Sequence, residues 1–82
     1  MEIAVLTPDK EIFQGEITSV IVPGAGGRFE VRNNHAPIVS ALTEGKVKIK
    51  KQGGEMLEFG IEKGFLEVLN NKLSLLVQGV KE

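Results

Sequence analysis

The stretch KVKIKKQGGEMLEFGI, residues 46–61, alternates charged and apolar residues on both sides of a Gly-Gly pair. A period of two predicts a pair of strands, each with one face toward a core and one toward water. A three-residue loop, Gln52-Gly53-Gly54, keeps each face of one kind, and a loop shifted to Gly53-Gly54-Glu55 keeps the same parity. The first loop pairs Val47 with Phe59, Ile49 with Leu57 and Lys48 with Glu58.

A second hairpin is predicted to turn at Asn70-Asn71, because asparagine tolerates the positive φ that a type I′ turn requires. This hairpin is apolar on parts of both faces, since Phe65 and Leu76 share a face with Glu67. A strand pair of this kind is either central in a sandwich or covered by another protein. Its two-residue loop sets Val68 opposite Leu73, Leu66 opposite Leu75, Glu67 opposite Ser74 and Phe65 opposite Leu76.

Ten glycines and several Asn pairs divide the rest of the chain into short apolar runs. Such spacing predicts an all-β fold, a small antiparallel β-sandwich or flattened barrel of about eight to ten short strands. Residues 1–82 have room for a single such domain, without a C-terminal helical domain. Residues 11–22 are long for a strand, and we expect this strand to bend near Gly15, where a bulge would cost little. The predicted strands are residues 2–7, 11–22, 28–32, 38–42, 46–51, 56–61, 64–69 and 72–77.

Charge and composition argue against several classes of protein. The net charge is −1, whereas nucleic-acid-binding proteins usually carry a basic excess. Four phenylalanines without tryptophan or tyrosine make a poor platform for stacked bases. The absence of cysteine excludes disulfides and thiol chemistry. The N-terminus lacks the pattern of a signal peptide, and no stretch approaches the roughly 20 apolar residues of a membrane span.

No residue pattern predicts an enzyme. His35 is the only histidine, and neither a nucleophile pattern nor metal-ligand spacing accompanies it. We interpret it as a loop residue that bonds the backbone or contacts a partner. The glycine-rich segment 23–27 precedes a strand rather than a helix, which favours a wide turn with positive φ over a phosphate-binding loop. We therefore expect no catalytic residue, no cofactor and no metal.

A basic stripe on one predicted strand consists of Lys46, Lys48, Lys50 and Lys51. We expect Glu55, Glu58 and Glu62 on the returning strand to neutralise much of this charge, which leaves a solvated sheet face. A docking surface for an acidic partner is the second interpretation.

Taken together, these residues resemble the N-terminal domain of the ε subunit of F-type ATP synthases, whose mitochondrial counterpart is named δ. The likeness covers the whole chain in order, and the segment Asn34-His35-Ala36-Pro37 after a Pro-Gly turn is its most specific part. The other matching residues are Thr7-Pro8, Phe13, Gly15-Glu16, Val20-Ile21-Val22-Pro23-Gly24, Gly27, Phe29, Leu42, Gly45-Lys46-Val47, Gly64-Phe65-Leu66-Glu67-Val68 and Asn71.

The resemblance implies a non-catalytic rotor part at the foot of the central stalk. It would bind the γ subunit and rest on the polar loops of the c-ring, coupling proton-driven rotation to ATP synthesis. It would be peripheral, on the cytoplasmic (or matrix or stromal) side of the membrane, with no membrane insertion of its own. In the family, the end of the sandwich that bears the segment matching Gly27-Arg28-Phe29 and the His-Ala-Pro loop faces the ring. Carried over by position, the candidates for ring contact at this end are Arg28, Glu30, Asn33, Asn34 and His35. The apolar outer face of the Asn70-Asn71 hairpin makes Phe65 and Leu76 the candidates for γ contact.

The sequence departs from the family pattern in two places. The position of Arg28 is often acidic in relatives, so its charge is reversed here. Many relatives continue into a two-helix C-terminal domain that inhibits ATP hydrolysis and in some members binds ATP. The 82 residues do not include that domain, and the resemblance assigns neither activity to them.

Two other classes compete with this interpretation. A lipoyl- or biotinyl-type carrier domain is also a small all-β domain with a lysine at a hairpin tip, and Lys72 lies one residue past Asn70-Asn71. Its neighbours Leu69 and Leu73 lack the carrier motif. A barrel that binds single-stranded nucleic acid is opposed by the charge and the missing aromatics.

Overall fold

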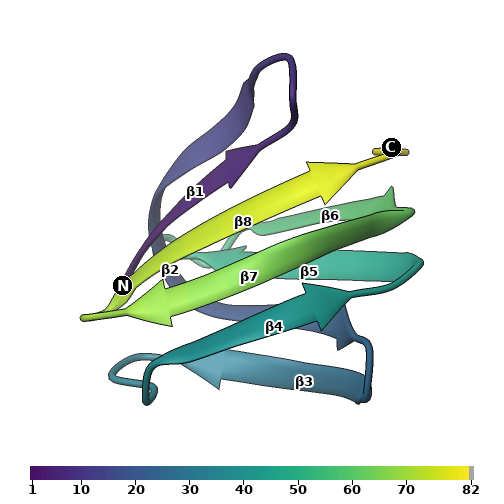
Figure 1. The fold of residues 1–82 in the computed structure, drawn as a ribbon. Helices are drawn as coiled ribbons and strands as arrows, with labels where there is room; N and C mark the ends of the chain where they lie inside the picture. The colour runs from purple at the N-terminus through teal and green to yellow at the C-terminus, as the bar shows by residue number, and fades with distance from the viewer. Residues whose placement is uncertain (82) are drawn as a thin grey trace.

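The computed structural model describes residues 1–81, and their ordered elements are eight β-strands (Figure 1). Within these residues there is no helix long and apolar enough to cross a membrane. The strand bounds differ from the predicted ones by two residues at most. The strands are β1 Glu2–Leu6, β2 Glu11–Gly24, β3 Gly27–Arg32, β4 Ile38–Leu42, β5 Gly45–Lys51, β6 Met56–Ile61, β7 Lys63–Leu69 and β8 Lys72–Gln78.

The strands form two layers (Figure 1). One layer has the order β1-β8-β7-β4, and the other has the order β3-β2-β5-β6. The long strand β2 joins them, because residues near its start pair with β1 and its second half pairs with β5 and β3. Its last residue, Gly24, pairs with Leu42 of β4. The result is a β-sandwich closed along one side, which confirms the predicted fold class.

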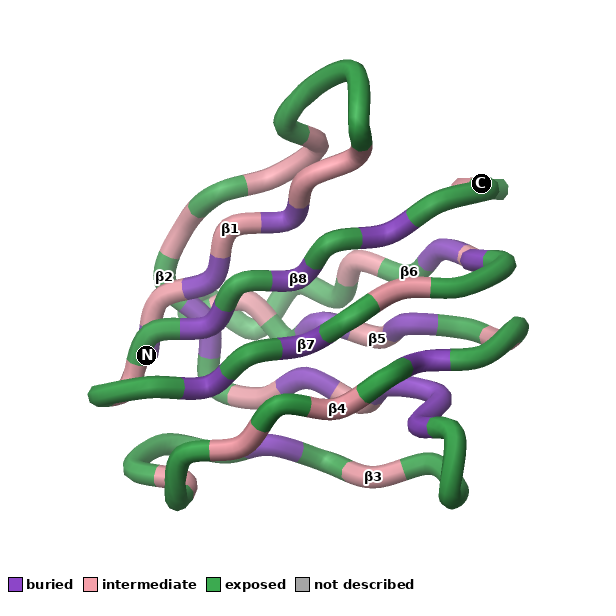
Figure 2. Tube along the Cα trace, in the orientation of Figure 1, coloured by how far each residue is buried: buried purple, intermediate pink, exposed green. Residues whose placement is uncertain are grey.

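The core lies between the two layers. Figure 2 shows buried positions alternating with exposed ones along the strands, as a period of two requires. Ile3, Val20, Ile49, Leu66 and Leu75 are among the side chains with no exposed surface. No polar or charged residue is buried in the part of the chain that the structure describes. The fold is therefore held mainly by apolar burial between the layers and by the backbone ladders.

Both predicted hairpin registers are confirmed. β5 and β6 pair Val47 with Phe59, and the amide of Lys51 donates to the carbonyl oxygen of Glu55 at 2.8 Å. The loop is therefore Gln52-Gly53-Gly54, and the shifted alternative is wrong. β7 and β8 meet at Asn70 and Asn71, whose φ values of 52° and 63° are those of the predicted type I′ turn.

Two details of the predicted sheet need correction. The pairing of β1 with β8 is parallel, whereas an antiparallel sandwich was expected. These are the first and last strands, so the whole chain between them supplies the long connection that a parallel pair needs. The second detail is the exact place of the bulge, because Gly15 itself pairs regularly with Ile3. The register of β2 shifts near Ile12, within its pairing with β1, and again near Thr18, where β2 has changed partner from β1 to β5.

The glycine-rich segment is a tight turn of two residues, Ala25 and Gly26, rather than a wide one. A Cβ at Gly24 would lie 2.7 Å from both the carbonyl oxygen of Gly27 and the ring of Phe29. Only glycine fits this close approach. The amide of Ala25 donates to Ala41, and the amide of Thr43 donates to Pro23, each at 2.9 Å, so the turn ties β2 to β4.

Leu75 and Leu76 of β8 face opposite sides of their sheet, so substitutions at these two positions test the register of the strand. Leu75 is fully buried, so Leu75→Ala is expected to lower the free energy of unfolding by about 2–5 kcal/mol. Leu76 is about half exposed, so Leu76→Ala is expected to cost about 1 kcal/mol or less. Urea denaturation measures both values, and equal losses would contradict the register of β8.

Candidate functional site

An apolar row crosses the outer face of the layer β1-β8-β7-β4. Leu6, Leu76, Phe65 and Ala41 stand opposite one another in register on these four strands. Phe65 is 57% exposed and Leu76 is 49% exposed, which is unusual for side chains of this size in the middle of a sheet. The structure thus joins the two residues expected to bind γ, and adds one neighbour on each side.

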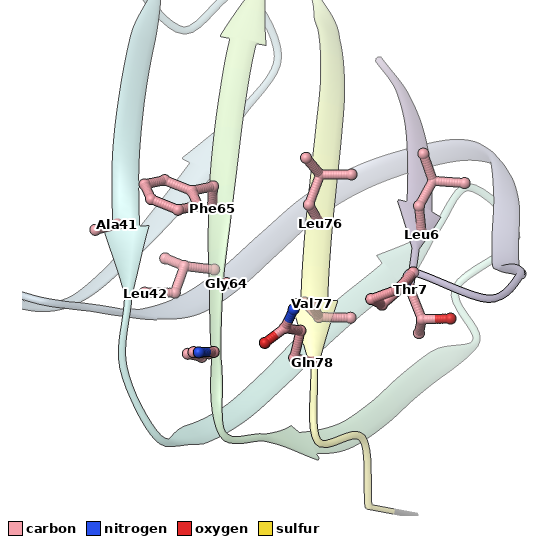
Figure 3. Close-up of a pocket in the computed structure, with 11 residues that line it drawn as sticks. Leu6, Thr7, Ala41, Leu42, Gly64, Phe65, Leu76, Val77 and Gln78 are labelled. Carbon is pink, nitrogen blue, oxygen red and sulfur yellow. The ribbon is translucent and has the colours of Figure 1, made fainter.

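A groove of about 560 Å³ runs along this row (Figure 3). In Figure 3 the side chains of Phe65, Leu76 and Leu6 come from three neighbouring strands and line it together. The groove is lined by Leu6, Thr7, Pro8, Ala41, Leu42, Lys63, Gly64, Phe65, Leu76, Val77 and Gln78. Val39 and Leu69, also exposed, extend the apolar surface along β4 and β7.

The chemistry of this surface suits burial against another protein. Its polar side chains, Thr7, Lys63 and Gln78, stand beside apolar ones and form no cluster of titratable groups. No group of three His, Cys, Asp or Glu residues able to hold a metal occurs within residues 1–81. Contiguous apolar surface of this kind marks sites of protein association. We refer to Leu6, Ala41, Phe65 and Leu76 as the apolar row.

Sequence reasoning missed half of this row. Phe65 and Leu76 were found because the two-residue turn fixes their register locally. Leu6 and Ala41 enter through the pairings of β8 with β1 and of β7 with β4, which join segments far apart in the chain. Nothing in the local sequence specifies those pairings.

A second candidate region is the loop after β3, which brings Asn33, Asn34 and His35 together. The amide of Asn34 donates to Oδ1 of Asn71 at 2.8 Å. The side chain Oδ1 of Asn33 accepts a hydrogen bond from the amino group of Met1, also at 2.8 Å. The loop is therefore tied to the β7–β8 turn and to the start of β1, so its shape is fixed by neighbouring strands.

His35 is half-buried in this loop. Its Nδ1 lies 2.7 Å from the carbonyl oxygen of Ala36. A carbonyl oxygen only accepts, so this bond requires the proton on Nδ1 and leaves Nε2 for a partner. The structure thus shows the backbone bond that was expected of a loop histidine.

Arg28 and Glu30 do not lie with the loop residues. Arg28 is at the start of β3 and Asn33 follows its end, so their backbones are about 17 Å apart. Glu30 lies between them and pairs with Arg32 at 3.3 Å. The single loop-bearing end expected from the sequence is therefore replaced by an edge, since β3 pairs only with β2 (Figure 1). We call β3 and the loop 33–35 the β3 edge.

Comparison with known proteins finds one family across the chain. The family described as "ATP synthase, Delta/Epsilon chain, beta-sandwich domain" matches residues 1–82. An ATP synthase epsilon chain from Chlorobium limicola is 45% identical over 76 residues, which is 93% of this chain and 86% of that one. One from Leptospira borgpetersenii is 38% identical over 93% of this chain but only 59% of its own length. These matches do not favour a lipoyl or biotinyl carrier.

Solved structures show the same fold. A chain from the mitochondrial ATP synthase of Euglena gracilis, solved with OSCP, F1 and the c-ring, superposes with a TM-score of 0.88. It is 19% identical, and the match covers 95% of this chain and 50% of that one. A chain from the central stalk and c-ring of the Tetrahymena thermophila enzyme gives a TM-score of 0.84 at 21% identity, over 100% of this chain and 66% of that one.

Substitutions at Asn71 test how the loop 33–35 is held. Asn71→Gly keeps the left-handed backbone but removes the acceptor of the Asn34 amide, so that amide is expected to exchange faster with solvent. Asn71→Ala removes the same acceptor and adds the cost of positive φ, about 1–2 kcal/mol. Hydrogen exchange and urea denaturation measure the two effects. Unchanged exchange at Asn34 in both variants would show that the side chain of Asn71 does not hold the loop.

Proposed function

This chain belongs to the family of ATP synthase delta and epsilon chain β-sandwich domains, and from this membership we propose that residues 1–82 act as one non-catalytic unit of the central stalk. In this role the unit links the γ subunit to the c-ring and couples proton-driven rotation to ATP synthesis. It is peripheral and meets the membrane only through its partners. The observation that carries the proposal is the family match over residues 1–82, and the exposed apolar row supports it.

The apolar row is proposed to bind γ. Two large side chains in it, Phe65 and Leu76, are about half exposed in the isolated chain and would lose water on docking. Fully burying a side chain of this size is worth about 1.5–3 kcal/mol, so a few such residues can anchor an interface. The groove beside them, about 560 Å³, can accept side chains of the partner.

The β3 edge is proposed to face the c-ring. Arg28, Glu30 and His35 lie along this one edge, so a flat ring surface could meet all three. β3 lies at the bottom of the sandwich in Figure 1. The apolar row lies instead across the layer β1-β8-β7-β4, where Figure 3 draws its side chains. Two partners could therefore be held at the same time without competing for the same residues.

The construction of the sandwich suits the transmission of torque. Every strand is bonded to a neighbour, and β2 is shared between the two layers. The loops that join the strands are short, and the Ala25-Gly26 turn is bonded to β4. A force applied at the β3 edge would thus pass through backbone ladders to the apolar row with little deformation.

Serine substitutions test the γ surface. Phe65→Ser and Leu76→Ser are each expected to weaken co-purification with γ about tenfold or more, because each removes an apolar contact worth at least about 1.4 kcal/mol. Met56→Ser is the matched control, because Met56 is 59% exposed but lies on β6 in the other layer. Unchanged γ affinity in folded F65S and L76S, or an equal loss in M56S, would remove the apolar row from the proposal.

Crosslinking tests the ring surface. The chain has no cysteine, so single cysteines at Glu30 or His35 give unambiguous attachment points. In the assembled ATP synthase we expect both to crosslink to the c-ring. A cysteine at Asp9 should not crosslink to the c-ring, because the β1–β2 turn lies at the opposite side of the sandwich from β3 (Figure 1). Crosslinks from position 9 and none from 30 or 35 would place the ring on the wrong side for this account.

A further inference from the structure

The outer face of the layer β3-β2-β5-β6 carries an excess of positive charge. Register places five cations on this face, from β3 and β5. We call them the basic face: Arg28, Arg32, Lys46, Lys48 and Lys50. The carboxylates among them are Glu30 and Glu58, so the face has an excess of three positive charges. Because the whole chain carries −1, the remaining residues carry four negative charges in excess.

The carboxylates on the face neutralise only part of it. Glu30 pairs with Arg32 at 3.3 Å. Glu58 is shared by two lysines, Lys46 at 4.0 Å and Lys48 at 3.8 Å, and one carboxylate balances only one of them. The other two predicted partners of the lysine stripe, Glu55 and Glu62, form no ion pair with it within residues 1–81. The expected neutralisation by the returning strand is therefore confirmed for Glu58 alone.

Arg28 is held in place without being neutralised. Its Nη1 donates to the backbone carbonyl oxygen of Lys46 at 3.0 Å. Since β2 lies between β3 and β5, the side chain crosses a whole strand to make this bond. A carbonyl oxygen carries no net charge, so this bond orients the guanidinium without pairing it with an opposite charge. Lys50, two strands away, has no ion-pair partner among the described residues.

We propose that the basic face docks an acidic segment of another polypeptide. The proposal does not rest on the stalk function, because it follows from the charges and the register alone. Cations on neighbouring positions of one face are about 7 Å apart along a strand, which matches alternate residues of an extended acidic chain. Lys46, Lys48 and Lys50 form a row along β5, so an extended acidic chain can follow this row while Glu30 on β3 and Glu58 on β6 stay beside it. A continuous anionic lipid surface would cover both acids as well and be opposed by them. A mixed pattern with a positive excess favours a polypeptide partner.

The test uses the full chain and hexaglutamate with blocked ends as the probe, followed by amide chemical shifts in NMR. At about 50 mM salt the shifts should concentrate on residues 28–32 and 46–50, and at about 500 mM salt they should shrink. The double variant Arg28→Glu with Lys50→Glu should weaken binding about fivefold or more. The control, Lys63→Glu with Lys72→Glu, makes the same change of charge on the other layer. It should weaken hexaglutamate binding less than about twofold.

Three results would overturn the proposal. Equal losses of hexaglutamate affinity in the two double variants would show that only the net charge of the chain matters. Shifts elsewhere on the chain, or none at low salt, would show that the basic face does not bind the peptide. If vesicles of phosphatidylglycerol and phosphatidylcholine in equal parts broadened the amide signals of the basic face, and hexaglutamate did not shift them, the face would be assigned to lipid instead. The amide spectrum of each variant also reports whether it is folded.

Discussion

The register of β7 and β8 decides which apolar side chains hold the sandwich together and which stay on its surface. Leu66 and Leu75 face the core, whereas their neighbours Phe65 and Leu76 face outward. A slip of one residue would exchange the two sets and place exposed side chains in the core. The type I′ turn at Asn70-Asn71, with positive φ at both residues, fixes this register. One local constraint therefore defines both the core and the apolar row.

The sequence predicted those parts of the fold that depend on nearby residues. Two hairpins follow from alternation and turn chemistry, and both registers are correct. The parallel pairing of β1 with β8 and the shifts in β2 depend on contacts between distant strands, which a periodic pattern does not encode. Gly15 was chosen as the place for a bulge because glycine tolerates one, yet β2 shifts register near Ile12 and near Thr18 instead, the second beside its change of partner.

The candidate site shows the same division. Phe65 and Leu76 were predicted as a pair because one hairpin contains both, while Leu6 joins them only through the parallel pair. The expected ring contacts were carried over by position and were expected together at one end of the sandwich. The structure separates Arg28 from the loop with His35 by the length of β3, so that an edge replaces an end. The bond of Arg28 to Lys46 crosses β2 and has no signature in the sequence.

Register places the apolar row on the surface of the sandwich, where we propose that γ covers it. A structure of the assembled central stalk containing this chain would show whether it does. We expect Phe65 and Leu76, 57% and 49% exposed in the isolated chain, to become buried against γ while Leu66 and Leu75 keep their core contacts. If both exposed side chains stayed in water and γ met the sandwich through another face, the apolar row would not be the γ surface.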